Sequence, residues 1–236
     1  MSALTDIVKV LRSPGCQNIN FQYKNIKVSG SGFRKIASEI LLGHIKIVSS
    51  FTVPSNAAKY NFIYNYLVTG IFPEKNLIVH ECTHALNDLH KLKILKIDDE
   101  ASAYIAQCFY MIIANEFSIN SFSKTTADRF YKGCINNPGK SSCHKAIFHN
   151  GLVIAMDYLT KAKPIDKFIE QLRNAIQHHP LYSRTARNRM NNYDGLINKH
   201  IPQAHLNKVH GKIIKPPNLY HNSIFLPKEY LGYKSN

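Results

Sequence analysis

Apolar and polar residues alternate in the first third of the chain and then change to a helical spacing. The alternation is clearest at Ile26–Val28 and His44–Val48, and a period of two is typical of half-buried strands. From residue 74 onward, apolar residues recur three and four positions apart, which predicts helices. The expected strands cover 18–29, 43–53 and 60–69, the expected helices cover 33–42, 74–91, 98–117, 142–161 and 164–178, and residues 4–12 fit either. This order predicts an α+β fold with a mainly helical C-terminal half.

The turns and breaks between these elements indicate the expected domain organisation. Ser29–Gly32 reads as a turn, because glycine alternates with serine over four residues. After residue 195 the apolar periodicity fades, and Pro216 and Pro217 interrupt any regular element. We therefore expect one domain over 1–195, followed by an irregular basic tail over 196–236. The apolar share of 44% is sufficient for a hydrophobic core in such a domain.

The candidate chemistry lies in the predicted helix over 74–91, in the run His80-Glu81-Cys82-Thr83-His84. Two histidines four residues apart lie on one face of a helix and can bind the same zinc ion. A glutamate beside the first histidine can then take a proton from a zinc-bound water. The alternative is a pair of hydrogen-bonded histidines on a partly buried helix. The spacing favours the metal site.

A catalytic zinc site needs a third protein ligand, and two residues compete for that role. His90 would extend the motif only if the chain turned at Asn87, which tolerates a left-handed conformation. A helix that continues past Asn87 would instead rotate His90 away from the metal. Glu100 begins the next predicted helix, where Asp98 or Asp99 can act as the cap. Glu100 is the favoured ligand, and a glutamate that merely complements the helix dipole is the alternative.

His80-Glu81-x-x-His84 followed by Glu100-Ala101-x-Ala103 resembles the zincin metallopeptidases in their gluzincin arrangement. The resemblance covers residues 60–115 and includes small bacterial proteins, some of which are toxin or effector domains. It implies a small antiparallel or mixed sheet packed on an active-site helix, with a peptide substrate along an edge strand. It also implies one catalytic zinc ion on His80, His84 and Glu100, with Glu81 as general base. The chain departs from the thermolysin-like version, since the Asn-Glu pair and the downstream Asp are absent.

Other polar residues are candidates for supporting roles. Asp88 lies four residues after His84 and either orients a metal ligand or faces solvent. A developing oxyanion needs a further hydrogen-bond donor. Six candidates occur in the C-terminal half, and the sequence does not choose among them: His178, His179, Tyr182, Arg184, Tyr193 and His200.

The charge balance points to an anionic partner. Lys and Arg total 30 against 15 acids, which gives a formal net charge of +15. Five of the acids fall within twenty residues around the motif, from Glu81 to Glu100, so an acidic pocket on a basic body is expected. Nucleic acid, a membrane surface or an acidic protein would suit the basic body, and solubility alone is the alternative.

The compartment depends on targeting signals and on the five cysteines. No apolar run is long enough to span a membrane, and the N-terminus lacks the pattern of a secretory signal. We therefore expect a cytoplasmic protein, or one exported without a standard signal. Cys134 and Cys143 flank a turn-rich segment and would pair in an oxidising compartment. Reduced, buried thiols are the preferred interpretation.

Together these features predict a zinc-dependent endopeptidase. The resemblance adds the expectation of a bacterial effector or toxin, which can have an inhibitor or immunity protein as a partner. One alternative is a basic nucleic-acid- or protein-binding module on a zincin scaffold. Another is a cytoplasmic stress-response protease that acts on a DNA-bound regulator. Metal-dependent proteolysis separates the peptidases from the binding module.

Overall fold

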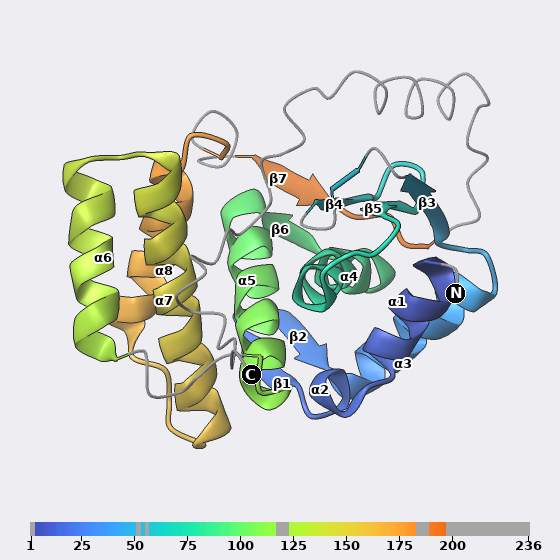
Figure 1. Cartoon of the computed structure of the whole chain (residues 1–236), viewed down its shortest axis with the longest axis horizontal. Helices are drawn as coiled ribbons and strands as arrows, with labels where there is room; N and C mark the ends of the chain where they lie inside the picture. The colour runs from blue at the N-terminus through green and yellow to red at the C-terminus, as the bar shows by residue number, and fades with distance from the viewer. Residues whose placement is uncertain (1–2, 51–52, 55–56, 117–122, 183–188, 197–236) are drawn as a thin grey trace, which may run out of the picture. The chain divides into compact units, whose positions relative to one another are not determined.

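A computed structural model describes residues 3–50, 53–54, 57–116, 123–182 and 189–196 (Figure 1). The chain divides into two compact units. The described residues of the first unit fall within 3–20, 28–92 and 193–196, and those of the second within 21–27, 93–116, 123–182 and 189–192. Both units contain helices and strands, so the predicted mixture of α and β structure is confirmed. The predicted tail over 196–236 lies outside the described residues, apart from Leu196.

A three-stranded sheet lies in the first unit, in the order β3-β5-β4. β3 (Lys46–Ser50) runs parallel to β5 (Tyr66–Gly70), whereas β4 (Ala58–Asn61) runs antiparallel to β5. In the register of the antiparallel pair, Tyr60 lies opposite Leu67. The sheet is therefore mixed, and β4 forms one of its edges.

The single strand expected over 60–69 is wrong, because the chain turns within this range. The side-chain oxygen of Asn61 accepts hydrogen bonds from the N–H groups of Ile63 and Tyr64, at 3.0 and 3.2 Å. Asn65 then adopts a left-handed conformation with φ of 49°, which asparagine tolerates. An asparagine-capped turn thus separates β4 from β5.

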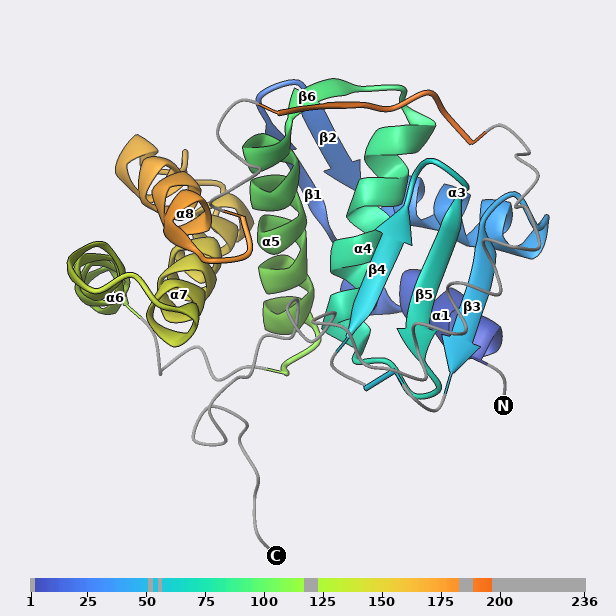
Figure 2. The ribbon, with the colours of Figure 1, turned by 90° about the horizontal axis from the view of Figure 1, so that it is seen from above.

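Four helices complete the first unit: α1 (Ala3–Leu11), α2 (Pro14–Gln17), α3 (Gly30–Leu41) and α4 (Lys75–Leu89). α4 packs against β4 and α1 packs against β3, and both helices also contact α3. α1, α3 and α4 lie on one face of the three-stranded sheet (Figure 2). This arrangement places the motif helix α4 directly beneath the edge strand β4.

The turn expected at Ser29–Gly32 is the beginning of α3. Ser29 is the N-cap residue, and its hydroxyl accepts a hydrogen bond from the N–H of Gly32 at 3.2 Å. The serine that suggested a turn therefore caps a helix. The segment 18–29, which was expected to be one strand, forms a hairpin of β1 (Asn20–Tyr23) and β2 (Ile26–Ser29). Lys24, in the turn between them, has a φ of 53°.

The second unit is mainly helical, as expected for the C-terminal half. It contains β6 (Lys93–Leu95), α5 (Lys96–Ile113), α6 (Lys124–Asn136), α7 (Lys140–Leu159), α8 (Asp166–His178) and β7 (Met190–Asn192). α7 contacts α5, α6 and α8, and β6 pairs antiparallel with β7. The sequence did not predict α6, because only Ala127 and Cys134 of this helix are buried. Within the described part of the chain, no helix is both long and apolar enough to cross a membrane.

A disulfide joins Cys134, in the last turn of α6, to Cys143, in the first turn of α7. The preference for reduced thiols at these positions is therefore wrong. α6 was not predicted, so the two cysteines were expected only to flank a turn-rich segment, whereas they lie at the adjoining ends of two consecutive helices. Cys16, Cys82 and Cys108 form no disulfide, and all three are buried.

Removing this disulfide is expected to destabilise the second unit. The bridge closes a loop of about ten residues, for which the chain-entropy estimate is roughly 2–3 kcal/mol. The double variant Cys134→Ser/Cys143→Ser should lose about this much free energy of unfolding in a urea titration. Reductant should destabilise the wild type by a similar amount and leave the double variant unchanged. A titration of the unfolded, unreduced wild type that finds five reactive thiols instead of three would contradict the pairing.

Candidate metal centre

Helix α4 holds the motif residues in a buried environment. Every residue from Leu77 to Asp88 is buried, so the helix is enclosed on all sides and not along one apolar stripe. The side chains of His80 and His84 project one turn apart, and their ring centroids are 5.1 Å apart. Two imidazoles kept from solvent on one helix face are suited to bind a common ion.

Glu100 comes from the first turns of α5. This helix begins at Lys96 with Leu95 as its N-cap residue, so the expected capping by Asp98 or Asp99 is wrong. The two aspartates lie instead within the helix, just ahead of Glu100. Glu100 itself is buried, with 8% of its surface exposed.

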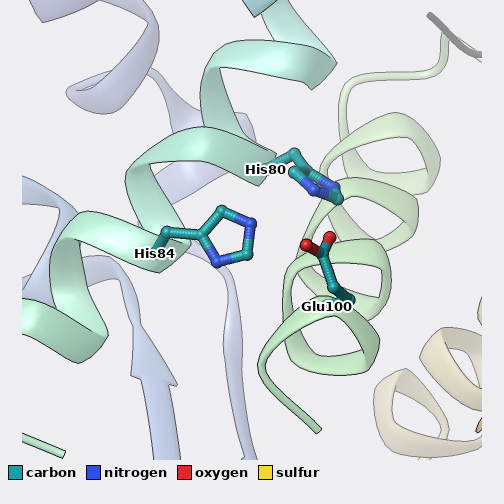
Figure 3. Close-up of side chains that lie close together, drawn as sticks. All are labelled: His80, His84 and Glu100. Carbon is teal, nitrogen blue, oxygen red and sulfur yellow. The ribbon is translucent and has the colours of Figure 1, made fainter. Parts of the chain in front are cut away.

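The structure brings His80, His84 and Glu100 together. One possible ligand atom from each side chain lies within 4.8 Å of the other two, and Figure 3 shows the three side chains turned toward one another. Among the described residues, no other group of three His, Cys, Asp or Glu side chains meets this criterion. This buried group could hold a metal ion, with two imidazole nitrogens and one carboxylate oxygen as donors.

His90 does not belong to this group. α4 continues through Leu89 without a turn at Asn87, and His90 is the C-cap residue with an exposed side chain. The left-handed residue that ends the helix is Lys91, with a φ of 53°. The longer motif that would have recruited His90 is therefore contradicted by the continuous helix.

Glu81 is directed toward the edge strand of the sheet. Its Oε2 atom accepts a hydrogen bond of 2.7 Å from the backbone N–H of Tyr60 in β4. Glu81 is 2% exposed, so this carboxylate lies in a largely dry environment. A fixed backbone donor limits how the carboxylate can rotate.

Asp88 is fully buried, so its expected alternative of facing solvent is wrong. Its Oδ2 accepts a hydrogen bond of 2.7 Å from the hydroxyl of Tyr60, and its Oδ1 accepts one of 3.0 Å from the N–H of Gly195. Gly195 has a φ of 94°, and a Cβ there would come within 2.8 Å of the Lys91 side chain. Only glycine fits this close approach without displacing Lys91. No local pattern in the sequence marks Tyr60 or Gly195 as part of the site.

Two of the acidic residues expected to form one pocket, Asp98 and Asp99, bind different partners. Asp98 accepts hydrogen bonds from the Tyr23 hydroxyl at 2.8 Å, the Lys24 ammonium at 2.6 Å and the Arg173 guanidinium at 3.0 Å. Burial and the adjacent Asp98 carboxylate raise the pKa of Tyr23 far above its usual range, so this hydroxyl remains a donor. Asp99 accepts a hydrogen bond of 2.7 Å from the side-chain amide of Asn191 in β7. These contacts fix the first turns of α5, which carry Glu100.

The candidate oxyanion donors have structural contacts. His178 Nδ1 lies 2.8 Å from the carbonyl oxygen of Asn174, one turn back in α8. The buried ring of His179 stacks on His144 at 4.3 Å, and the hydroxyls of Tyr182 and Tyr104 are 3.0 Å apart. The backbone N–H of Tyr193 donates to the carbonyl of Leu92, and its ring packs edge-on against Phe62. Arg184 and His200 lie outside the described residues.

Comparison with protein-family models, curated proteins and solved structures finds no match for this chain. The similarity to zincins therefore remains a prediction from the motif and from the spacing to Glu100. The candidate function depends on the chemistry of the chain's own residues.

Proposed function

We propose that this protein is a zinc-dependent peptidase that uses His80, His84 and Glu100 to bind the ion and Glu81 as general base. The observation that supports this most strongly is the convergence of the three donor side chains on one buried position. Glu81 follows His80 directly in the same helix, so the ligand pair and the base are built from one rigid element.

The donor set suits zinc. Two histidine nitrogens and one carboxylate oxygen are a ligand set found in catalytic zinc sites, which keep a fourth position for water. Zinc bonds of 2.0–2.2 Å in a tetrahedral arrangement require ligand atoms roughly 3.4 Å apart. The donors here lie within 4.8 Å of one another, so small side-chain rotations would complete the site. Bound there, a zinc ion would lower the pKa of its water toward neutrality and polarise a substrate carbonyl.

Glu81 is proposed to move the proton. A carboxylate next to the first ligand can take a proton from the attacking water and deliver it to the leaving amine. Its Oε2 is held by the N–H of Tyr60, which limits the carboxylate to a narrow range of orientations. General acid–base catalysis of this kind contributes about 10²–10⁴-fold to a rate.

An extended peptide is the proposed substrate. β4 is an edge strand, and α4 packs against it. Edge strands bind extended segments by adding them to the sheet through backbone hydrogen bonds. Because the N–H of Tyr60 is engaged by Glu81, a peptide would pair with other backbone groups along the outer edge of β4.

Charge on α6 and α7 supports an anionic partner. Arg129 and Lys145 lie 5.2 and 5.7 Å from the centre of the Phe130 ring, and neither has an acidic partner among the described residues. Burial, together with these two cations, lowers the pKa of His149 to about 4, so this ring is neutral at pH 7. A local excess of positive charge would suit an acidic substrate protein or a nucleic acid.

The disulfide supports a site of action outside a reducing cytoplasm. Bridges such as Cys134–Cys143 persist in oxidising environments and are rare among cytosolic proteins. This is consistent with an exported effector or toxin, with an inhibitor or immunity protein as its natural counterpart. The proposal of an effector role depends on the zincin resemblance.

A chelation experiment tests the proposed peptidase. The protein would be stripped with a chelator, dialysed and incubated with a proteome-derived peptide library, with and without added Zn²⁺. We expect new peptide termini, detected by mass spectrometry, only when zinc is restored. His84→Ala, purified in parallel, should give none, which excludes a contaminating protease. No cleavage by the zinc-loaded wild type, together with salt-sensitive binding to single-stranded DNA, would favour the basic binding module instead.

A further inference from the structure

Tyr60 connects the edge strand to α4 at two points. Its backbone N–H donates to Glu81 Oε2 at 2.7 Å, and its hydroxyl donates to Asp88 Oδ2 at 2.7 Å. Glu81 and Asp88 are seven residues apart, which is close to two helical turns, so they point in nearly the same direction. One residue of β4 therefore spans two turns of the motif helix, with His84 between its two contacts.

The hydrogen bond between the Tyr60 hydroxyl and Asp88 is shielded from solvent. Tyr60 is 7% exposed and Asp88 is 0% exposed, so water does not compete for the bond. Burial and the adjacent Asp88 carboxylate raise the pKa of Tyr60 far above its usual range, which keeps the hydroxyl protonated. A longer contact of 3.3 Å to the Asn65 side-chain oxygen is also present. The contact to Asp88, at 2.7 Å, is the shorter of the two and is therefore the stronger hydrogen bond.

Asp88 is itself fixed from the other side. Its second oxygen accepts the N–H of Gly195, and the neighbouring Tyr193 N–H donates to Leu92 after the end of α4. The carboxylate therefore cannot follow Tyr60 if β4 shifts. A movement of β4 along α4 would break the hydroxyl contact and withdraw the N–H from Glu81 together.

We propose that Tyr60 is a positioning residue, whose hydroxyl on Asp88 holds β4 in the register that keeps its own N–H on Glu81. This role depends on the proposed function, in which Glu81 is the general base. It assigns Asp88 to orienting the base through Tyr60. The chemical consequence is that the hydroxyl acts on the rate of the proton-transfer step and leaves metal binding unchanged.

Two readouts test this positioning role. The first is hydrogen exchange of the residue-60 amide by NMR, which needs no substrate. In Tyr60→Phe this amide should exchange roughly tenfold faster, because one hydrogen bond holding the strand is lost. Asp88→Asn should have an effect in the same direction, and Glu81→Ala should remove the protection directly. The second readout is kcat on fluorescein-labelled casein, which should fall roughly tenfold in Tyr60→Phe with KM and zinc content unchanged.

Tyr66→Phe is the matched control. Its hydroxyl accepts a 3.1 Å hydrogen bond from Asn61 of β4, so the control removes a different contact to the same strand. It should leave both the residue-60 amide and kcat as in the wild type. The proposal would be overturned if the residue-60 amide exchanged at the wild-type rate in both Tyr60→Phe and Asp88→Asn. It would also be overturned if Tyr66→Phe changed the exchange rate and kcat as much as Tyr60→Phe does. If casein is never cleaved but the amide responds as expected, the contact holds and the peptidase function fails.

Discussion

Glu81→Gln is expected to abolish peptide hydrolysis while the protein still binds one zinc ion per chain. The amide of glutamine cannot accept a proton from water at neutral pH, so general-base catalysis is lost. Its oxygen can still accept the N–H of Tyr60, which now holds Glu81 Oε2 at 2.7 Å, so the local structure should persist. We expect kcat to fall by about 10²–10⁴-fold. The measurement pairs a hydrolysis assay with zinc content from elemental mass spectrometry.

The same substitution outside the motif provides the control. Glu39→Gln changes a carboxylate on α3 that contacts His44 at 2.6 Å, so it carries an equal loss of charge within the first unit. It should retain full activity. Full hydrolysis by Glu81→Gln would remove the assignment of Glu81 as the base, whatever the metal content. Loss of zinc together with activity would instead mean that Glu81 contributes to metal binding.

The parts of the site that the sequence predicted are those in which local spacing determines geometry. His80 and His84 share a helix face because any helix places residues four apart on one side. Glu100 was favoured because it begins the next predicted helix and because the gluzincin arrangement, which the motif resembles, has a glutamate there. Burying such a charge is costly unless it is paired or binds a metal. α8, whose apolar residues fall on one face, and α7, which is long and buried over most of its length, were predicted close to their observed limits.

The parts that the sequence missed depend on contacts between distant residues or on exceptions to local preference. Tyr60 meets Asp88 across 28 positions, and Arg173 meets Asp98 across 75. No periodicity encodes such pairs. The two hairpins were read as single strands because Lys24 and Asn65 adopt left-handed conformations without the glycine that signals a turn. These features were not predicted because they depend on contacts between distant residues or on backbone conformations that the residue type does not signal.

Removal of any one metal ligand is expected to abolish stoichiometric zinc binding. The three donors are buried on two helices, and each supplies one of only three protein ligands. The loss of affinity in His80→Ala, His84→Ala or Glu100→Ala should exceed the 10–100-fold that follows from altering a residue that only orients a ligand. Elemental mass spectrometry of each purified variant measures this directly. Activity should disappear in parallel with the metal.

Thermal unfolding adds a second, independent measure of the same site. A ligand at 100 times its dissociation constant stabilises the folded state by about 2.7 kcal/mol, so added zinc should raise the wild-type Tm. The three variants should show no such rise. His90→Ala is the control, because His90 is exposed at the end of α4 and outside the ligand group, so it should bind and respond like the wild type. Retention of zinc by Glu100→Ala with loss in His90→Ala would reverse the assignment. Retention by all four variants would place the metal elsewhere and leave the histidine pair a structural feature of a buried helix.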